Sequence, residues 1–333
     1  MIVLENVSKK FKVSQRKKGL FNFLMSAVNP KYSTKLAVDN LNFSIAPGEI
    51  VGYIGPNGAG KSTTIKMLCG ILTPSEGKVW ISGLDPSNER NRKKVTTQIG
   101  VVFGQRTQLW MDLPLVDSLR LNQKIYGIDE KAFQQQLKLF DDTLSIGSFL
   151  HTPVRQLSLG QRMRGDLVAS LLHRPSILFL DEPTIGLDVL AKDALRKMIR
   201  EINHQYGVTV ILTTHDMSDI EETCKRIILI DNGTLQFDGS LDDIKQKYGS
   251  HRTLFVEFYH KPAQLHLPEL ELLKTVDNKY WYSFDYTTSN PSDLLTKIAA
   301  QAAIKDLSVN EIKVEDIIRQ IYSERKLMRE GLG

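Results

Sequence analysis

The residues at positions 55–63 have the types and spacing of a loop that binds phosphate groups. They fit the pattern G-x-x-x-x-G-K-[ST] and read Gly55-Pro56-Asn57-Gly58-Ala59-Gly60-Lys61-Ser62-Thr63. Glycines allow backbone N–H groups to close around a phosphate, while Lys61 can reach the outer phosphates and Ser62 can ligate Mg²⁺. An apolar run at residues 50–54 predicts a buried strand before the loop, and residues 63–69 predict a helix after it. We therefore expect a nucleoside triphosphate site, because an ordinary glycine-rich turn would not need this context.

Two acidic residues end a second apolar run. Residues 176–180 predict a buried strand, which Asp181 and Glu182 follow directly. Because the carboxyl ends of parallel strands meet at one edge of a sheet, these carboxylates are expected beside the phosphate-binding loop. Asp181 would then support the Mg²⁺ shell, and Glu182 would be placed to polarise an attacking water as a general base.

Three short motifs surround these acids. They are Leu-Ser-Leu-Gly-Gln at residues 157–161, Gly-Leu-Asp at residues 186–188 and Thr-Thr-His-Asp at residues 213–216. Each motif alone is more often a plain loop, and a lone histidine is more often structural. Their order around one phosphate-binding loop favours a shared catalytic role.

With these motifs together, the chain resembles the nucleotide-binding subunits of ATP-binding cassette (ABC) transporters over residues 1 to about 245. The resemblance implies an α/β P-loop NTPase of the ABC ATPase type, with a RecA-like core and a helical subdomain at about residues 105–165. It also implies ATP and Mg²⁺ as ligands. The implied ATP-binding residues are Phe11, Gly55, Asn57, Gly58, Gly60, Lys61, Ser62, Thr63, Ser158, Gly160, Gln161 and Asp188.

The same resemblance assigns catalytic roles to three residues. Glu182 would be the general base, His215 the switch histidine and Gln105 the glutamine of the Q-loop. It also implies that Mg²⁺ is held by Ser62, Gln105 and Asp181.

Such ATPases close as head-to-tail dimers, so the signature loop, which is Ser158 to Gln161 here, would act on ATP held by the other subunit. Because all the motifs lie in one chain, a homodimer is the economical interpretation.

Two positions depart from the commonest family pattern. Leu159 replaces the first glycine of the usual LSGGQ, and Ile185-Gly186 replaces the usual Ser-Ala. The first change leaves Ser158 and the N–H of Gly160 available for phosphate contact.

Composition indicates a globular protein without its own membrane pathway. The chain has 333 residues, of which 41% are hydrophobic and 24% charged. No apolar run approaches the roughly 20 residues of a spanning helix, and residues 1–5 lack a signal-peptide layout. We expect a peripheral protein at the cytoplasmic face of the cell membrane, with transport provided by other chains. Cys69 and Cys224 are expected to be buried thiols, which fits a reducing compartment.

An amphipathic basic insertion at about residues 12–35 interrupts the family layout. Residues 1–35 contain eight basic residues against one acidic residue. A solvated face is the alternative interpretation, but the cations bracket an apolar pattern made by Leu20, Phe21, Phe23, Leu24 and Val28. The segment resembles the gate helix of ATPases that serve glycan exporters, which lies against the permease at the bilayer surface. Phe11 is the expected adenine platform, and Tyr32 is its rival.

A domain boundary is predicted between residues 249 and 250. Residues 1–249 would form the ABC ATPase domain, and residues 250–333 a small α+β domain of ferredoxin-like type with β-β-α-β-α order. Alternating positions predict two of its strands, at Leu254, Val256 and Phe258 and at Tyr280, Tyr282, Phe284 and Tyr286. Because it carries no chemical motif, we expect a regulatory or dimerisation role.

The favoured function is the motor subunit of an ABC-2-type exporter. Residues 107–114, next to Gln105, resemble the corresponding string in ABC-2 ATPases, and an interface role for Trp110 and Met111 competes with burial in the core. The expected partners are integral membrane permease subunits and a second copy of this chain, with no nucleic acid. The alternatives are an importer ATPase and a soluble ABC-type ATPase that acts on ribosomes or nucleic acid.

Overall fold

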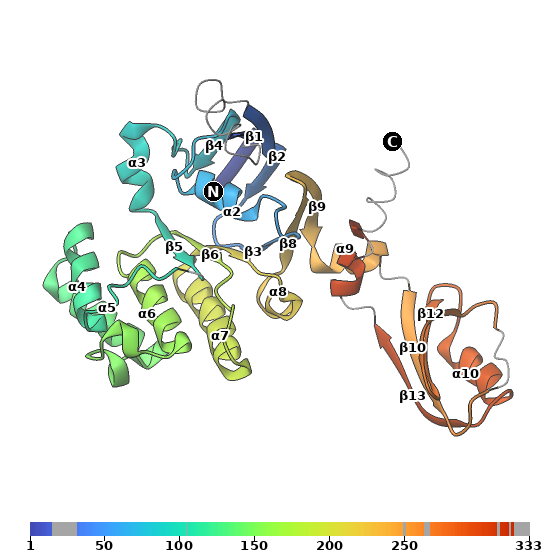
Figure 1. The fold of residues 1–333 in the computed structure, drawn as a ribbon. Helices are drawn as coiled ribbons and strands as arrows, with labels where there is room; N and C mark the ends of the chain where they lie inside the picture. Colours follow the sequence, from blue (N-terminus) through green and yellow to red (C-terminus); the bar gives the residue numbers. More distant parts are fainter. Residues whose placement is uncertain are drawn as a thin grey trace, which may run out of the picture. The chain divides into compact units, whose positions relative to one another are not determined.

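The computed structural model describes residues 1–14, 32–104, 106–248, 251–262, 267–311, 314–319 and 321–322. The chain divides into two compact units, Met1–Asp238 and Gly239–Gly333 (Figure 1). The first compact unit therefore ends before helix α9 (Leu241–Tyr248), which the sequence-based boundary at residue 249 assigns to the ATPase domain.

A six-stranded sheet forms the centre of the first unit. Its order is β5-β6-β7-β3-β8-β9, and the pairs from β5 to β8 are parallel. The central strands are apolar and buried on both faces, as parallel sheets require. Their bounds are β5 (Ile99–Phe103), β6 (Ile177–Asp181), β7 (Thr209–Thr213), β3 (Ile50–Ile54), β8 (Arg226–Asp231) and β9 (Thr234–Ser240).

A second, antiparallel sheet of three strands has the order β2-β1-β4. The strands are β1 (Ile2–Ser14), β2 (Tyr32–Ile45) and β4 (Glu76–Ile81). Its buried side chains share one core with those of the central sheet, for example Leu41 with Phe179. The predicted insertion at about residues 12–35 is wrong at its two ends, because residues 12–14 and 32–35 extend β1 and β2, which pair as far as Ser14 with Tyr32. The part of the insertion expected to form a gate helix, residues 17–31, lies outside the described residues.

Helices complete the first unit. Those beside the sheets are α2 (Lys61–Leu68), α3 (Glu89–Thr96), α7 (Val189–Tyr206) and α8 (Met217–Thr223). The expected helical region contains α4 (Leu115–Tyr126), α5 (Glu130–Leu144), two 3₁₀ turns (Gly147–Phe149 and Val154–Gln156) and α6 (Leu159–Leu171). Helix α5 has an apolar face on which Phe133, Leu137 and Phe140 are buried.

The second unit contains an antiparallel sheet of order β11-β12-β10-β13, which packs against α10 (Pro291–Ala299) (Figure 1). The strands are β10 (His251–Phe258), β11 (Glu271–Val276), β12 (Lys279–Asp285) and β13 (Ile304–Glu311). The two predicted alternating strands correspond to β10 and β12. The predicted order lacked β11, because all six of its residues are exposed and it has no buried face to produce alternation. The described residues of the last predicted helix, 314–319 and 321–322, are helical.

Candidate active site

The phosphate-binding loop joins the end of β3 to the start of α2. Gly60 precedes the helix with φ of +106°, where a side chain would be strained. A Cβ atom at Gly60 would lie 2.5 Å from the carbonyl oxygen of Ala37, and one at Gly55 would lie 2.4 Å from that of Ile230. Backbone therefore crosses the loop too closely for any residue except glycine at these two positions.

Lys61 is 7% exposed and is held inside this loop. Its Nζ donates to the carbonyl oxygens of Gly55, at 2.6 Å, and Pro56, at 3.2 Å. Burial lowers the pKa of Lys61, while the carboxylates of Glu182 and Asp181 oppose that shift. The ammonium group therefore interacts electrostatically with both acids.

The two acids lie at the carboxyl end of β6, where the sequence predicted them. The Asp181 carboxylate accepts from the Thr213 hydroxyl at 2.6 Å, and the Glu182 N–H donates to the Thr213 carbonyl at 3.0 Å. Gly104 approaches so closely that a Cβ atom would lie 2.0 Å from the Glu182 carbonyl oxygen. Sequence reasoning selected Thr213 only as part of the motif at residues 213–216 and did not select Gly104, although Gly104 adjoins Gln105.

Glu182 has φ of +55°, which is rare for a residue with a side chain. Holding a residue in such a conformation costs about 1–3 kcal/mol of folding free energy, and residues strained in this way are concentrated at functional sites. His215 lies on the segment after β7, with its Nδ1 3.9 Å from Glu182 Oε1. The structure therefore brings the predicted base and the predicted switch histidine together, with His215 mostly exposed to solvent.

One cavity of about 1070 Å³ joins these elements. The predicted adenine platform Phe11 lines it, whereas the side chain of Tyr32 is not among those described. Gln105 also lies outside the described residues, and its neighbours Gly104 and Arg106 line the cavity. The other predicted residues on the lining are Asn57, Gly58, Gly60, Lys61, Ser62, Thr63, Asp181 and Glu182.

The cavity is suited to Mg²⁺ bound together with a phosphate chain. Ser62 and Asp181 both line it. Within the described ranges, no three His, Cys, Asp or Glu side chains gather to hold a metal on their own. Mg²⁺ commonly uses one or two carboxylates with substrate phosphates, so this small set of oxygen donors fits that ion.

The signature motif forms the start of α6. Ser158 caps this helix, and its side chain and that of Gln161 complete a reciprocal capping box. Asp188 similarly caps α7 by accepting from the N–H of Ala191 at 2.8 Å. Ser158, Gly160 and Asp188 line a separate cavity of about 530 Å³. Neither Lys61 nor Glu182 lines that cavity, so one chain presents two different surfaces.

The two departures from the family pattern contact each other in this second cavity. Leu159 is 42% exposed, and Gly186 has φ of +73°. A Cβ atom at Gly186 would lie 2.8 Å from a terminal carbon of Leu159. Glycine at position 186 thus leaves the space that leucine at position 159 uses.

Comparisons with known proteins agree with this geometry. Residues 38–185 match the ABC transporter family. The chain is 38% identical over 217 residues to the probable multidrug ABC transporter ATP-binding protein YbhF of Escherichia coli, which covers 65% of this chain but only 36% of YbhF. It is 30% identical over 223 residues to the probable sulfate/thiosulfate import ATP-binding protein CysA of Chlorella vulgaris, covering 67% of this chain and 93% of CysA.

A solved structure has the same fold. The ATP-binding cassette MJ0796, in a dimeric post-hydrolysis state bound to ADP and Pi, superposes with a TM-score of 0.60. It is 26% identical to this chain and covers 72% of it and 99% of MJ0796. The fold and site are those of an ABC-type ATPase cassette, and the chain belongs to the family of ABC transporter ATP-binding proteins. No helix among the described residues is long and apolar enough to cross a membrane.

Proposed function

We propose that this chain hydrolyses ATP to power a membrane exporter whose permease is formed by separate integral membrane proteins of the ABC-2 type. It would bind them at the cytoplasmic face of the membrane as a peripheral subunit. The observation that carries this proposal is the meeting of Lys61, Asp181 and Glu182 at one cavity.

The chain's own residues account for the hydrolytic step. The loop N–H groups and Lys61 hold the β- and γ-phosphates, with the helix N-terminus of α2 adding partial positive charge. Glu182 accepts a proton from water as the water oxygen attacks the γ-phosphorus. The bond from the γ-phosphorus to the bridging oxygen then breaks, which leaves ADP and inorganic phosphate. Ser62, Asp181 and Gln105 would hold Mg²⁺, which would neutralise charge on the phosphates.

The residues of the second cavity would act on ATP that is bound by another copy of the chain. Ser158, Gly160 and Gln161 start a helix whose N-terminus suits an anion. They and Asp188 would contact the γ-phosphate side of ATP held by a second copy of this chain in a head-to-tail homodimer. The separation of the two cavities and the dimeric state of MJ0796 support this arrangement.

Two observations bear on whether the transporter exports or imports its substrate. The identity to the multidrug protein YbhF, 38%, exceeds the 30% to the import protein CysA, which favours export. Import stays the second candidate because the match covers 93% of CysA.

We propose that the second unit regulates or dimerises the ATPase and that residues 17–31 contact the permease.

Co-purification tests the proposal. The tagged chain should retain integral membrane proteins from detergent-solubilised membranes, and substrate should stimulate ATP turnover by the complex. Lys61→Ala should still co-purify with them but lack turnover. Recovery of ribosomes or DNA in place of membrane proteins would contradict the transporter assignment, and substrate accumulation inside cells would contradict export.

A further inference from the structure

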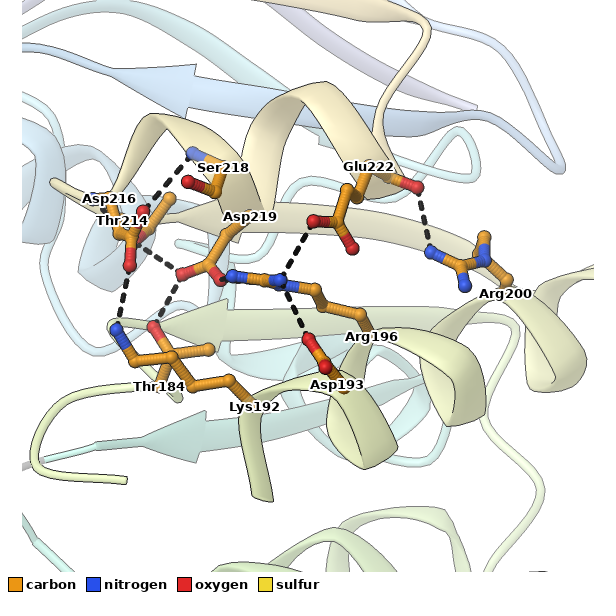
Figure 2. A network of polar contacts seen from close by, with 10 residues as sticks. All are labelled: Thr184, Lys192, Asp193, Arg196, Arg200, Thr214, Asp216, Ser218, Asp219 and Glu222. Carbon is orange, nitrogen blue, oxygen red and sulfur yellow. Dashed lines mark hydrogen bonds and ion pairs between the residues drawn. The ribbon is translucent and has the colours of Figure 1, made fainter. Parts of the chain in front are cut away.

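A buried ion pair lies behind the catalytic edge of the sheet. Asp219, on α8, is 0% exposed and Arg196, on α7, is 6% exposed. Both the Nε and Nη2 atoms of Arg196 lie 2.8 Å from Asp219 Oδ1 (Figure 2). A second link joins α7 to the N-cap residue of α8, because Lys192 Nζ lies 2.6 Å from Asp216 Oδ2. Charges buried this deeply persist only when their polar atoms are satisfied.

The other oxygen of Asp219 contacts the two segments that carry the proposed catalytic groups. Asp219 Oδ2 accepts from the hydroxyls of Thr184, at 2.6 Å, and Thr214, at 2.9 Å (Figure 2). Thr184 lies two residues after Glu182, and Thr214 immediately precedes His215. One carboxylate therefore joins both segments to each other and, through Arg196, to α7.

Glu182 needs such anchors. Its positive φ is unfavourable for a residue with a side chain and persists only where the surroundings over-determine it. On its amino side, the N–H of Glu182 donates to Thr213, at 3.0 Å to the carbonyl and 3.1 Å to the hydroxyl. On its carboxyl side, the bond from Thr184 to Asp219 is the side-chain anchor. Removing it would allow the strained turn to relax.

We propose that Asp219 is a positioning residue for ATP hydrolysis, which fixes the Glu182 and His215 segments against α7 without touching substrate. This inference rests on the proposed catalytic roles of Glu182 and His215. Because α7 begins at its cap Asp188, the same link connects the catalytic edge to the surface proposed to meet the second copy. A change in α7 on dimer closure would therefore reach Glu182 through Arg196 and Asp219.

Thr184→Val tests this in the full chain. Valine nearly keeps the shape of threonine but removes the donor to Asp219 Oδ2, while the pair of Asp219 with Arg196 stays intact. We expect kcat for ATP to fall about 10- to 100-fold, because small misplacements of reacting groups have effects of this size. KM for ATP should change by less than about twofold, because the variant leaves the nucleotide contacts in place. The matched control is Thr223→Val. Thr223 is a buried threonine on α8, the helix that carries Asp219, and its hydroxyl has no hydrogen-bond partner among the described residues.

A second variant separates positioning from general damage. In a Glu182→Gln background, Thr184→Val should slow the residual turnover by less than about twofold, because groups that act through one another are not additive. Turnover by Thr184→Val equal to that of Thr223→Val, or a full further loss in the Glu182→Gln background, would overturn the positioning role. Wild-type turnover by Glu182→Gln alone would instead overturn the proposed function of Glu182.

Discussion

The two cavities of the first unit are built in different ways. Around the phosphate-binding loop, residues from separate strands hold one another, as Thr213 of β7 holds both Asp181 and Glu182 of the neighbouring segment. Around the signature motif, the polar groups bond locally, since Ser158 and Gln161 cap their own helix and Asp188 caps α7. A single chain thus preorganises the catalytic edge, whereas the signature surface consists of exposed helix N-termini. Such groups become a site only when an anion is brought to them.

The largest effect is expected at the preorganised cavity. Glu182→Gln removes the base but keeps the size and most contacts of the side chain. Turnover of ATP should fall at least about 10²-fold, since general-base contributions run from about 10² to 10⁴. ATP affinity, measured by fluorescence titration or calorimetry, should stay near the wild-type value. Turnover close to wild type would remove Glu182 from the mechanism.

A smaller loss of turnover is expected from a change in the signature loop. The loss caused by removing its helix cap, Ser158, can be compared with the effect of removing the cap of another helix. Ser158→Ala should destabilise its helix by about 1 kcal/mol, as loss of a cap usually does. Asp129→Ala should cost a similar amount, because Asp129 caps α5 by accepting from the N–H of Ala132. Only Ser158→Ala should also lower kcat, by about 10-fold, which corresponds to one hydrogen bond to a charged group. Equal turnover by the two variants would mean that Ser158 is a helix cap and nothing more.

The adenine end of the larger cavity should affect binding and leave chemistry unchanged. Phe11→Ala should raise KM for ATP by about 10-fold, because stacking of a base on an aromatic ring contributes about 1–3 kcal/mol. Its kcat should stay near the wild-type value. Tyr32→Ala is the matched variant, and a rise in KM for Tyr32→Ala but not for Phe11→Ala would reassign the platform.

A further prediction concerns stability instead of turnover, at the contact between α6 and the segment after Gln105. Asp166 of α6 is 5% exposed and accepts from the Thr107 hydroxyl and the Gln108 N–H, both at 2.9 Å. Burial raises the pKa of Asp166 from 3.8 to about 6, while these hydrogen bonds oppose the shift. The folded state therefore keeps a proton that the unfolded state loses between these values, so this group's stabilising contribution falls as pH rises through that window.

Asp166→Asn should remove that dependence while its oxygen still accepts both hydrogen bonds. The free energy of unfolding of Asp166→Asn relative to wild type should increase between pH 4 and pH 7, by at most about 3 kcal/mol. Urea denaturation at several pH values measures it. A difference that stays constant with pH, or changes in the opposite direction, would contradict the raised pKa.

Local spacing was enough to select the phosphate-binding loop and the two acids that line the larger cavity. The residues of the phosphate-binding loop, Asp181 and Glu182 were identified because their chemistry depends on neighbours in sequence, and the structure collects them at the ends of β3 and β6. Phe11, which was selected from the family resemblance, lines the same cavity. The roles of these residues stay predictions.

The supports behind the cavity could not be predicted in the same way. Arg196 and Asp219 are ordinary charged residues on two helices, 23 positions apart, and only tertiary packing makes them a buried pair. The positive φ of Glu182 likewise depends on contacts with β7 that no local pattern encodes. Strand β11 was missed for a different reason, because an edge strand without buried residues lacks the alternation on which strand prediction depends.

We propose that ATP joins the phosphate-binding cavity of one copy to the signature loop of another. The most direct test is the molar mass of the Glu182→Gln chain in solution, measured by light scattering with and without ATP, with Lys61→Ala/Glu182→Gln as the control that lacks the phosphate-binding lysine. We predict that ATP converts the 37.7 kDa chain into a species of about twice that mass and leaves the control unchanged. A Glu182→Gln chain that is saturated with ATP but keeps the mass it has without ATP would show that ATP does not join two copies.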